Sequence, residues 1–480
     1  MKIPIIRPSS GVHQFNFDVA VIGGGSGGYA AARTAVAAGL KTVVIEGGEE
    51  VGGLCILRGC MPTKALLYMA KVAYMVKHSA PFGVRAGKIS FDFKKAMARK
   101  DLLIKDFAGY RVQQLNSGKF KFVRATAKFR DPHTLELTPF PGNGKRASTI
   151  TANHFVIATG SAVAPSPYCG LNDIDCLTTD TALTLKKLPN SLIILGGGPT
   201  ASEFAQFFAR FGVRVTMIQR SPHILQYFDE DASATVETVF RREGIRLYTG
   251  TKLLNSKRKG KLKTIEFEQN GKRDSVSAEE VLFALGRIPN TASLGLENAG
   301  VKTTDNGMVI ANEFMQTSAP HIYTAGDCAG PHEIVHIAVN QGEVAGRNIT
   351  NPNSAQMDYR LITMVVFTDP QLAFVGLTEK AAAAQGIPFV SASYPFNDHG
   401  PSMIMNGIDG FVKLLADPNS GEIIGGQCAG MIGGEMIHEI VAAMAKRMTV
   451  RELATLPHYH PTLSEIWTYP AEELAERIKK

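Results

Sequence analysis

The stretch Phe17–Gly28, FDVAVIGGGSGG, decides the fold of this chain. It joins a short apolar run rich in β-branched residues to a glycine cluster with the spacing GxGxxG. A helix-like segment, YAAARTAVAAG, follows over residues 29–39, and a second strand-like run, KTVVIE, ends at Glu46. Strand, glycine turn, helix, strand and acid within about thirty residues form the pattern of a Rossmann unit. The sequence therefore predicts a dinucleotide site at this turn.

Each glycine of this turn has its own task in such a unit. Gly23 allows the tight turn, Gly25 lets the backbone approach a pyrophosphate, and Gly28 permits close packing of helix on strand. The N-terminus of the helix stabilises the phosphate charge. Glu46 is expected to accept hydrogen bonds from both hydroxyls of an adenosine ribose.

The same pattern occurs a second time, at a constant offset of 173 residues. Residues 191–195, SLIIL, precede the second glycine cluster, and SEFAQFFARFG and VRVTMI follow as helix and strand. We therefore expect two dinucleotide sites; the alternative is a chance repeat of βαβ units that bind nothing. The candidate binding residues of the second copy are Gly196, Gly198, Ala201 and Gln219.

One position of the repeat differs in a way that bears on the choice of nucleotide. Where the first copy has Glu46, the second has Gln219, followed by Arg220. An acid there binds the ribose 2′-hydroxyl and repels a 2′-phosphate, whereas a neutral residue beside an arginine removes that discrimination. We therefore expect NADP(H) to be slightly favoured over NAD(H). In the alternative reading, Arg220 is a solvated charge and Gln219 hydrogen-bonds a ribose.

The composition excludes several classes of protein. With 480 residues, the chain exceeds the size of a single core and is expected to form about two to four domains. Six cysteines are too few for a disulfide-stapled secreted scaffold, so free thiols, redox groups or ligands in a reducing cytoplasm are expected. No run of about 18 apolar residues occurs, and Pro4 and Pro8 interrupt the first apolar stretch, so neither a membrane span nor a secretory signal is expected. The net charge is +8, but the sequence has no dense cluster of basic residues apart from residues 257–259. We therefore expect neither nucleic acid nor a membrane as a partner.

A pair of cysteines follows the first module, in the stretch GGLCILRGCMPTK over residues 52–64. Cys55 and Cys60 are spaced too widely for the usual zinc CxxC, and no second Cys/His pair follows at ligand distance, so no metal site is expected. A structural zinc site and two unlinked core cysteines are the alternatives. The stretch resembles the GGxCxxxGCxPxK pattern of the FAD-dependent pyridine nucleotide-disulfide oxidoreductases, and the resemblance covers nearly the whole chain.

The resemblance implies a redox-active disulfide between Cys55 and Cys60. Cys55 would be the interchange thiol that attacks the substrate, and Cys60 would be the thiol nearest the flavin. Gly53 and Lys64 would belong to the flavin site, with Lys64 near flavin N5 and paired with Glu203 on the helix of the second module. Thiol–disulfide exchange needs a thiolate, which a nearby cation or a helix N-terminus stabilises.

Two residues in this stretch depart from the family pattern. Leu54 replaces the usual small polar residue before the first cysteine, and Arg58 lies inside the disulfide loop. An arginine there would stabilise thiolates and draw anionic substrates, or it would point to solvent.

Further segments resemble the family in order along the chain. VIATG is similar to the strand that closes the first half of the FAD domain, and FALGRIPN to the segment that leaves the nucleotide domain. IYTAGD is similar to the second FAD fingerprint, whose acid binds the ribityl chain; a plain strand end and turn is the alternative. IVHIAVNQGEVAGRNI is similar to the helix whose N-terminus faces the flavin pyrimidine ring. The cofactor-binding residues implied by these segments are Thr159, Gly160, Gly286, Arg287, Asp327 and Val335.

The C-terminal motif PHYHPTLSE spans residues 457–465. Taken alone, Thr462-x-x-Glu465 has the form of a capping box at the start of the last helix, with His460 as a loop histidine. The motif resembles the HPTxxE signature of the family, which implies His460 as the general acid/base and Glu465 as the residue that orients it. In the family this segment reaches the disulfide of the partner subunit, so the implied active site requires a homodimer. His458 is given a packing role.

The expected fold class is α/β, with two Rossmann-like dinucleotide-binding domains and a C-terminal α+β dimerisation domain. The FAD domain is expected over residues 1–160 and 286–353, interrupted by the NAD(P) domain over 161–285. The dimerisation domain is expected over 354–480.

The resemblance implies an enzyme that moves electrons between NAD(P)(H), FAD, the disulfide and a thiol substrate, most similar to the dihydrolipoamide dehydrogenases. The substrate would be a small thiol or disulfide, or a lipoyl-carrier protein. The alternatives are an NADPH-dependent reductase of the glutathione or mercuric type, although no cysteine follows Cys428, and a non-catalytic FAD-binding scaffold. The remaining cysteines are expected to be small core residues, namely Cys169, Cys176, Cys328 and Cys428.

Overall fold

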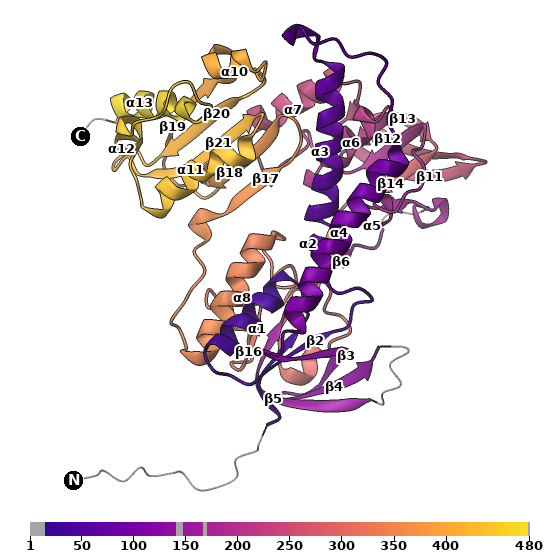
Figure 1. Ribbon diagram of the computed structural model, residues 1–480, viewed down its shortest axis with the longest axis vertical. Helices are drawn as coiled ribbons and strands as arrows, with labels where there is room; N and C mark the ends of the chain where they lie inside the picture. Colours follow the sequence, from indigo (N-terminus) through magenta and orange to yellow (C-terminus); the bar gives the residue numbers. More distant parts are fainter. Residues whose placement is uncertain (1–14, 141–146, 167–169, 479–480) are drawn as a thin grey trace. The chain divides into compact units, whose positions relative to one another are not determined.

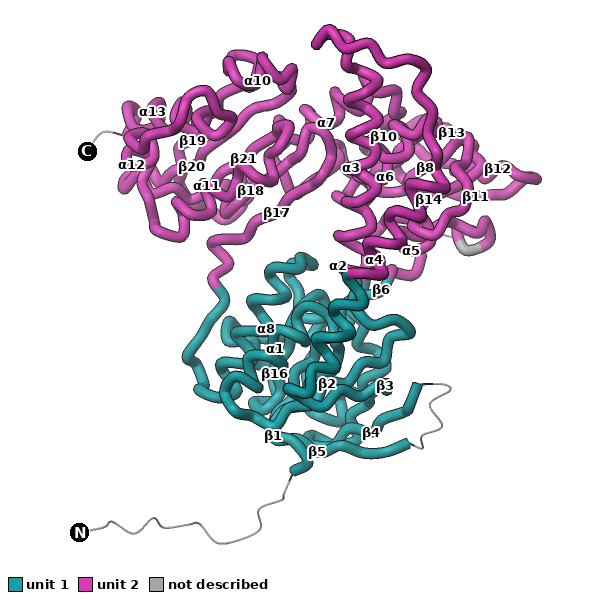
Figure 2. Tube along the Cα trace, viewed as in Figure 1, with its two compact units in different colours: residues 1–55, 107–162, 288–357 teal, residues 56–106, 163–287, 358–480 magenta. Residues whose placement is uncertain are grey.

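The computed structural model describes residues 15–140, 147–166 and 170–478, which form two compact units (Figures 1 and 2). Unit 1 joins Met1–Cys55, Phe107–Ala162 and Ile288–Met357, and unit 2 joins Ile56–Asp106, Val163–Arg287 and Asp358–Lys480. Residues 56–106, which we expected in the FAD domain, thus cluster with unit 2. Four of the five unit boundaries fall within α2 (Leu54–Leu57), α4 (Phe93–Leu115), β6 (Ser161–Val163) and β15 (Arg287–Pro289).

Unit 1 is built on a parallel sheet with the strand order β3-β2-β1-β5-β16, shown in teal in Figure 2. A further strand, β4, pairs antiparallel with β3 and β5. Four consecutive residues of β1, residues 19–22, are buried, as expected for a central parallel strand covered on both faces. The elements of this unit are β1 (Phe17–Ile22), α1 (Ser26–Ala37), β2 (Thr42–Glu46), β3 (Lys121–Asp131), β4 (Thr134–Pro139), β5 (Ser148–Ile157), β16 (Ile322–Thr324) and α8 (Val335–Thr350).

Helices α1 and α8 pack against each other through glycines. A Cβ atom on Gly342 would lie 2.2 Å from the carbonyl oxygen of Gly27, and one on Gly346 would lie 2.8 Å from Thr34 Cβ. Any larger residue would therefore separate the two helices. Near their N-terminal ends, a Cβ on Gly27 would lie 3.1 Å from the carbonyl oxygen of Ala338, so the first turns of the two helices lie together.

The first part of unit 2 contains a second parallel sheet, in the order β10-β9-β8-β14-β7. The predicted strand, helix and strand of the second repeat are present as β8, α6 and β9. A three-stranded antiparallel sheet, β11-β12-β13, is inserted before β14. These elements are β7 (Leu177–Thr178), α5 (Thr179–Ala182), β8 (Ser191–Leu195), α6 (Pro199–Arg210), β9 (Arg214–Ile218), α7 (Glu230–Arg242), β10 (Arg246–Tyr248), β11 (Thr251–Lys259), β12 (Leu262–Gln269), β13 (Lys272–Ala278) and β14 (Glu280–Phe283).

The C-terminal part of unit 2 is an antiparallel sheet in the order β17-β18-β21-β20-β19, covered by helices. Trp467 is fully buried in its core and donates a 3.2 Å hydrogen bond from Nε1 to the carbonyl oxygen of Met436. The elements are β17 (Thr363–Val366), β18 (Gln371–Gly376), α9 (Glu379–Ala384), β19 (Val390–Pro395), α10 (Gly400–Ile404), β20 (Phe411–Ala416), β21 (Ile423–Gly430), α11 (Gly433–Ala445), α12 (Val450–Thr455) and α13 (Thr468–Arg477).

One face of α6 holds the turn between β17 and β18. Glu203 accepts a 3.0 Å hydrogen bond from the backbone N–H of Phe367. Gln206 binds the backbone of Asp369 twice, accepting from its N–H at 2.7 Å and donating to its carbonyl oxygen at 2.8 Å. Arg210 donates to the Asp369 carboxylate at 3.0 Å. The three helical positions share one face at i, i+3 and i+7, so the nucleotide module and the C-terminal sheet are joined by polar contacts.

Candidate active site

The two glycine turns share one backbone geometry. Gly23 has φ +111°, and a Cβ there would lie 2.2 Å from the carbonyl oxygen of Ala158. Gly196, its partner in the repeat, has φ +113°, and a Cβ would lie 2.4 Å from the carbonyl oxygen of Ala284. Both positions need glycine because the backbone is left-handed and a neighbouring strand is too close. The repeat predicted from the sequence is thus confirmed in the backbone.

Glu46 lies against the first turn. Its carboxylate accepts hydrogen bonds from the backbone N–H of Gly24 at 2.8 Å and of Gly48 at 2.7 Å. These two bonds fix the carboxylate at the end of β2, on the edge where a dinucleotide binds in this type of sheet.

Gln219 takes the equivalent place over the second turn. A Cβ on Gly197 would lie 3.0 Å from both Cγ and Cδ of Gln219, so this side chain lies against the glycine turn. Arg220 is exposed. The site therefore has a neutral side chain and an available cation where the first site has a fixed carboxylate.

Several of the predicted FAD residues gather around the first turn. Gly25 caps α1 and Val335 begins α8, and neither helix has a side-chain cap or an acidic residue in its first turn. A Cβ on Gly53 would lie 2.8 Å from the Cα of Gly25, so the stretch before Cys55 lies against the turn. Asp327 accepts a 2.6 Å hydrogen bond from the hydroxyl of Ser161. Two uncapped helix N-termini offer backbone N–H donors to an anionic group, so this part of the unit suits FAD.

The other predicted cofactor residues lie at turns next to these elements. Thr159 and Gly160 follow β5, where the Gly160 carbonyl oxygen accepts a 2.9 Å hydrogen bond from the Asn290 N–H. Gly28 is buried, and a Cβ there would lie 1.9 Å from the carbonyl oxygen of Gly23. In the second copy, Gly198 caps α6, Ala201 is buried in its first turn, Gly286 has φ +131°, and Arg287 lies 3.6 Å from the Asp180 carboxylate.

Sequence reasoning missed Arg111, on α4. Its guanidinium carbon lies 4.4 Å from the centre of the Tyr29 ring. Within the described residues, its buried Nε and Nη1 atoms have no hydrogen-bond partner, and burial lowers the pKa of the guanidinium. Buried donors of this kind suit an anion, and a dinucleotide pyrophosphate is the anion that the surrounding elements predict. No motif marks an arginine inside a long helix, so the sequence offered no signal.

The two cysteines of the predicted redox pair are both half-buried. Cys55 lies on α2, and Cys60 is the first residue of α3 (Cys60–Lys77). The first turn of α3 has neither an acidic residue nor a side-chain cap, so its N-terminus stabilises negative charge on the Cys60 sulfur. Arg58 is exposed and Leu54 is half-buried.

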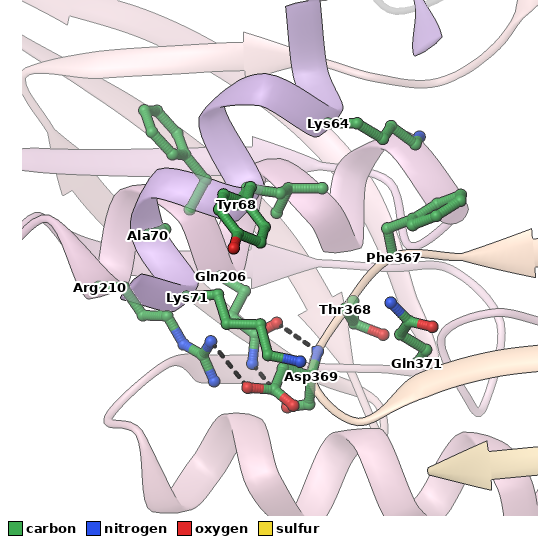
Figure 3. Close-up of a pocket in the computed structure, with 12 residues that line it drawn as sticks. Lys64, Tyr68, Ala70, Lys71, Gln206, Arg210, Phe367, Thr368, Asp369 and Gln371 are labelled. Atoms are coloured by element: carbon green, nitrogen blue, oxygen red, sulfur yellow. Dashed lines mark hydrogen bonds and ion pairs between the residues drawn. The ribbon is translucent and has the colours of Figure 1, made fainter. Parts of the chain in front are cut away.

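Lys64, one turn into α3, forms the predicted pair with Glu203. Its Nζ atom lies 2.9 Å and 2.7 Å from the two carboxylate oxygens, and 4.7 Å from the centre of the Phe367 ring. Figure 3 shows the cavity beside this pair, of about 270 Å³, between α3, α6 and the turn after β17. Its polar lining consists of Lys64, Tyr68, Lys71, Gln206, Arg210, Thr368, Asp369 and Gln371.

His460 and Glu465 form a dyad. The Nδ1 atom of His460 lies 3.1 Å and 3.0 Å from the two carboxylate oxygens of Glu465. The capping-box alternative is wrong, because Leu463 caps the short 3₁₀ helix Ser464–Trp467 without a side-chain bond. His458 instead pairs with Glu439, 2.5 Å from Nε2, which agrees with a packing role.

The remaining cysteines differ in burial. Cys328 and Cys428 are buried, and burial raises the pKa of both thiols, which confirms the structural role predicted for them. Cys176 is half-buried, and burial raises its pKa to about 11. Cys169 lies outside the described residues.

Within the described ranges, no group of three or more His, Cys, Asp or Glu side chains is arranged to hold a metal ion. Across the same described part of the chain, no helix has both the length and the apolar character required to cross a bilayer.

Comparison with known proteins identifies two family matches and many relatives. Residues 17–342 match the pyridine nucleotide-disulphide oxidoreductase model, and residues 362–471 match the dimerisation domain of the same family. The dihydrolipoyl dehydrogenase of Geobacillus stearothermophilus is 34% identical over 94% of this chain and 95% of its own. That of Bacillus subtilis is 34% identical over 94% of this chain and 96% of its own.

Solved structures show the same fold. LpdA from Mycobacterium tuberculosis has a TM-score of 0.86 and 27% identity, covering 95% of this chain and 99% of its own. The HOCl-induced flavoprotein disulfide reductase RclA from Escherichia coli, solved as a Cu(II) complex, has a TM-score of 0.83 at 24% identity, with coverage of 95% and 99%. At that identity RclA supports the fold alone.

These matches confirm the predicted α/β fold class and the predicted oxidoreductase activity, and the family implies FAD and NAD(P) as cofactors. The chain therefore belongs to the pyridine nucleotide-disulphide oxidoreductase family, as a flavoenzyme similar to the dihydrolipoyl dehydrogenases.

Proposed function

We propose that this enzyme exchanges electrons between NAD(P)(H) and a dihydrolipoyl-type dithiol through the Cys55–Cys60 pair. The observation that carries the proposal is the position of Cys60 at the uncapped N-terminus of α3, one turn before Lys64 and its partner Glu203. The relatives support the substrate class, since they are named dihydrolipoyl dehydrogenase and match this chain over almost their full length.

The residues of unit 1 fit FAD as the bound group. Glu46 would hold the adenosine ribose, the N-termini of α1 and α8 would face anionic parts of the molecule, and Asp327 would bind the ribityl chain. Arg111 would supply its unpaired donors to the pyrophosphate. Bound FAD supplies two-electron transfer between a nicotinamide and a disulfide.

The cysteine chemistry follows from thiolate nucleophilicity. The Cys55 thiolate attacks one sulfur of a substrate disulfide, which forms a mixed disulfide and breaks the substrate S–S bond. The leaving sulfur takes a proton from His460. The Cys60 thiolate then attacks the Cys55 sulfur, which forms the Cys55–Cys60 disulfide and releases the second substrate sulfur as a thiolate that takes a proton. Oxidation of a dithiol runs through the same steps in reverse.

The dyad geometry prepares His460 for this proton transfer. Since Glu465 accepts from Nδ1–H, the Nε2 atom is left to carry or receive the transferred proton. The His460 side chain is 80% exposed, so it is accessible to a neighbouring subunit. We infer a homodimer in which His460 serves the cysteine pair of the other subunit, and the dimerisation domain supports this arrangement.

The second glycine turn supports a slight preference for NADP(H). Gln219 places no fixed negative charge beside a 2′-phosphate, and the exposed Arg220 is available to bind one. This feature also favours a second candidate, an NADPH-dependent disulfide reductase of the glutathione type.

Three substrate assays with both nucleotides separate the candidates. We expect dihydrolipoamide oxidation to exceed reduction of glutathione disulfide or mercuric ion. Anaerobic reduction should give a long-wavelength charge-transfer absorption from the Cys60 thiolate beside the flavin, which Cys60→Ser should abolish together with turnover. Full turnover in Cys55→Ser or Cys60→Ser would rule out the disulfide route, and a preference for glutathione disulfide would select the second candidate.

A further inference from the structure

A second imidazole faces the carboxylate of the candidate dyad. His399 precedes α10, and its side chain is 1% exposed. Its Nε2 atom lies 3.5 Å from Glu465 Oε1, the oxygen that also lies 3.1 Å from His460 Nδ1. At 3.5 Å the contact is within ion-pair range but longer than an ordinary N–H···O bond, and within the described residues the buried Nε2 has no hydrogen-bond partner.

The other ring nitrogen of His399 fixes the tautomer. Nδ1 lies 2.8 Å from the hydroxyl of Ser402, which is fully buried. A hydroxyl can either donate or accept, whereas the Glu465 carboxylate can only accept. A neutral His399 therefore carries its proton on Nε2, toward Glu465, and accepts the Ser402 hydroxyl proton at Nδ1. The opposite tautomer would turn a nitrogen lone pair toward the carboxylate.

The surroundings keep this imidazole neutral. Burial lowers the pKa of His399, and the ionisable groups that act on it from the packed elements are Glu465 and His460. Other ionisable groups near His399 are Asp398, which precedes it in the chain, and Tyr469, whose ring meets the imidazole edge-on with centroids 6.3 Å apart. Tyr469 itself stacks on Tyr394 at 4.1 Å. The ring is thus held between an aromatic pair and the dyad.

We propose that His399 is a positioning residue for the dyad, since its buried Nε2 lies 3.5 Å from Glu465 Oε1, the oxygen that also contacts His460. This inference rests on the proposed role of His460 as proton donor. An N–H dipole held beside the carboxylate lowers the negative potential there, so Glu465 attracts the His460 imidazolium less strongly than it would alone. His399 therefore weakens the hold of Glu465 on the proton that His460 must release.

The test records the ¹⁵N chemical shifts of the histidine ring nitrogens across a pH titration, in the FAD-loaded enzyme labelled with ¹⁵N-histidine. The His460→Gln and His399→Gln variants assign the two residues. We expect His399 as the neutral Nε2–H tautomer at pH 7.5. We also expect the titration midpoint of His460 to rise by about half a pH unit in His399→Leu. His399→Gln retains a donor at similar reach and should stay close to the wild type. The pH profile of turnover should move with the His460 midpoint.

The outcomes separate cleanly. A wild-type Nδ1–H tautomer, an unchanged His460 midpoint in folded His399→Leu, or equal shifts in the Leu and Gln variants would overturn the proposal. If His399→Leu does not fold, Ser402→Ala replaces it: loss of the hydroxyl should increase the Nδ1–H population, and no change overturns the proposal. The titration needs no turnover, so retained activity in Cys55→Ser would refute the proposed function without affecting this result. His321→Gln, in unit 1, is the matched control and should leave His460 unchanged.

Discussion

Lys64 Nζ lies 2.7 Å from Glu203 Oε2, and the two partners differ sharply in exposure. The Glu203 side chain is 3% exposed, whereas that of Lys64 is 33% exposed. When an ion pair is broken, the cost depends on the charge left behind, and a buried carboxylate is the more expensive one. Removal of Lys64 and removal of Glu203 should therefore lower the free energy of unfolding by different amounts.

Lys64→Met should destabilise the protein more than Glu203→Gln. The first variant leaves a buried carboxylate and should cost about 3–5 kcal/mol of unfolding free energy. The second leaves a partly solvated ammonium, keeps an acceptor for the Phe367 N–H, and should cost roughly 1–2 kcal/mol. Urea unfolding of the FAD-loaded enzyme measures both. Lys64→Met/Glu203→Gln should recover part of the loss, and equal costs for the single variants would contradict this account.

His460→Gln should lower turnover by roughly 10²–10³-fold because the proton donor is lost. Its unfolding free energy should stay within about 0.5 kcal/mol of the wild type, because the side chain is largely exposed. His458→Leu is the matched control: it loses the contact with Glu439 and should lose stability with a smaller effect on turnover. Similar kinetic losses in both variants would argue against a special role for His460.

The enzyme should lose stability as the pH falls below about 6.5. Among the residues that the structure describes, four histidines have a pKa lowered chiefly by burial, so the folded protein binds fewer protons than the unfolded chain in this range. Their contribution is fully present above the unfolded pKa near 6.5 and is lost as the pH falls toward the folded values. The four are His154, His321, His332 and His399. Urea midpoints from pH 7.5 to 5.5 measure the slope, and His321→Gln should flatten it.

Gln219→Glu should reduce the use of NADPH relative to NADH. The new carboxylate would lie against the second glycine turn and repel a 2′-phosphate, so the ratio of kcat/KM values should fall by at least roughly tenfold. Gln219→Ala separates this repulsion from the loss of a contact. An unchanged ratio would show that the nucleotide does not reach this side chain.

Arg111→Met should weaken FAD binding and stabilise the FAD-free protein. Loss of charged hydrogen bonds should raise the FAD dissociation constant roughly tenfold or more. The apoprotein should gain stability because buried donors without partners are removed. Flavin fluorescence titration and apoprotein unfolding measure the two effects. Arg111→Lys keeps the charge without the planar fork, and unchanged FAD affinity in both variants would exclude a contact with the cofactor.

The local parts of this structure could be predicted from the sequence, because their signals are local. Glycine spacing and apolar periodicity located β1, α1 and β2, and their repeat at β8, α6 and β9. The Lys64–Glu203 pair, 139 residues apart, was expected only through the family resemblance. Arg111 and His399 lie in no motif, and their importance depends on which side chains fold around them. Thr462 and Glu465 have the spacing of a capping box, yet the carboxylate turns to His460 instead.

The contacts of α6 with residues 367–369 limit how this enzyme can be rebuilt from parts. A chain that ended at residue 357 would lose Phe367 and Asp369, and with them part of the hydrogen bonding of Glu203, Gln206 and Arg210. The nucleotide module, residues 163–287, therefore depends on contacts with residues outside it, although its sheet is complete. A chimaera in which residues 163–287 are replaced by those of a relative must also carry a matching β17–β18 turn. Without that turn the chimaera is expected to assemble poorly, whichever coenzyme it binds.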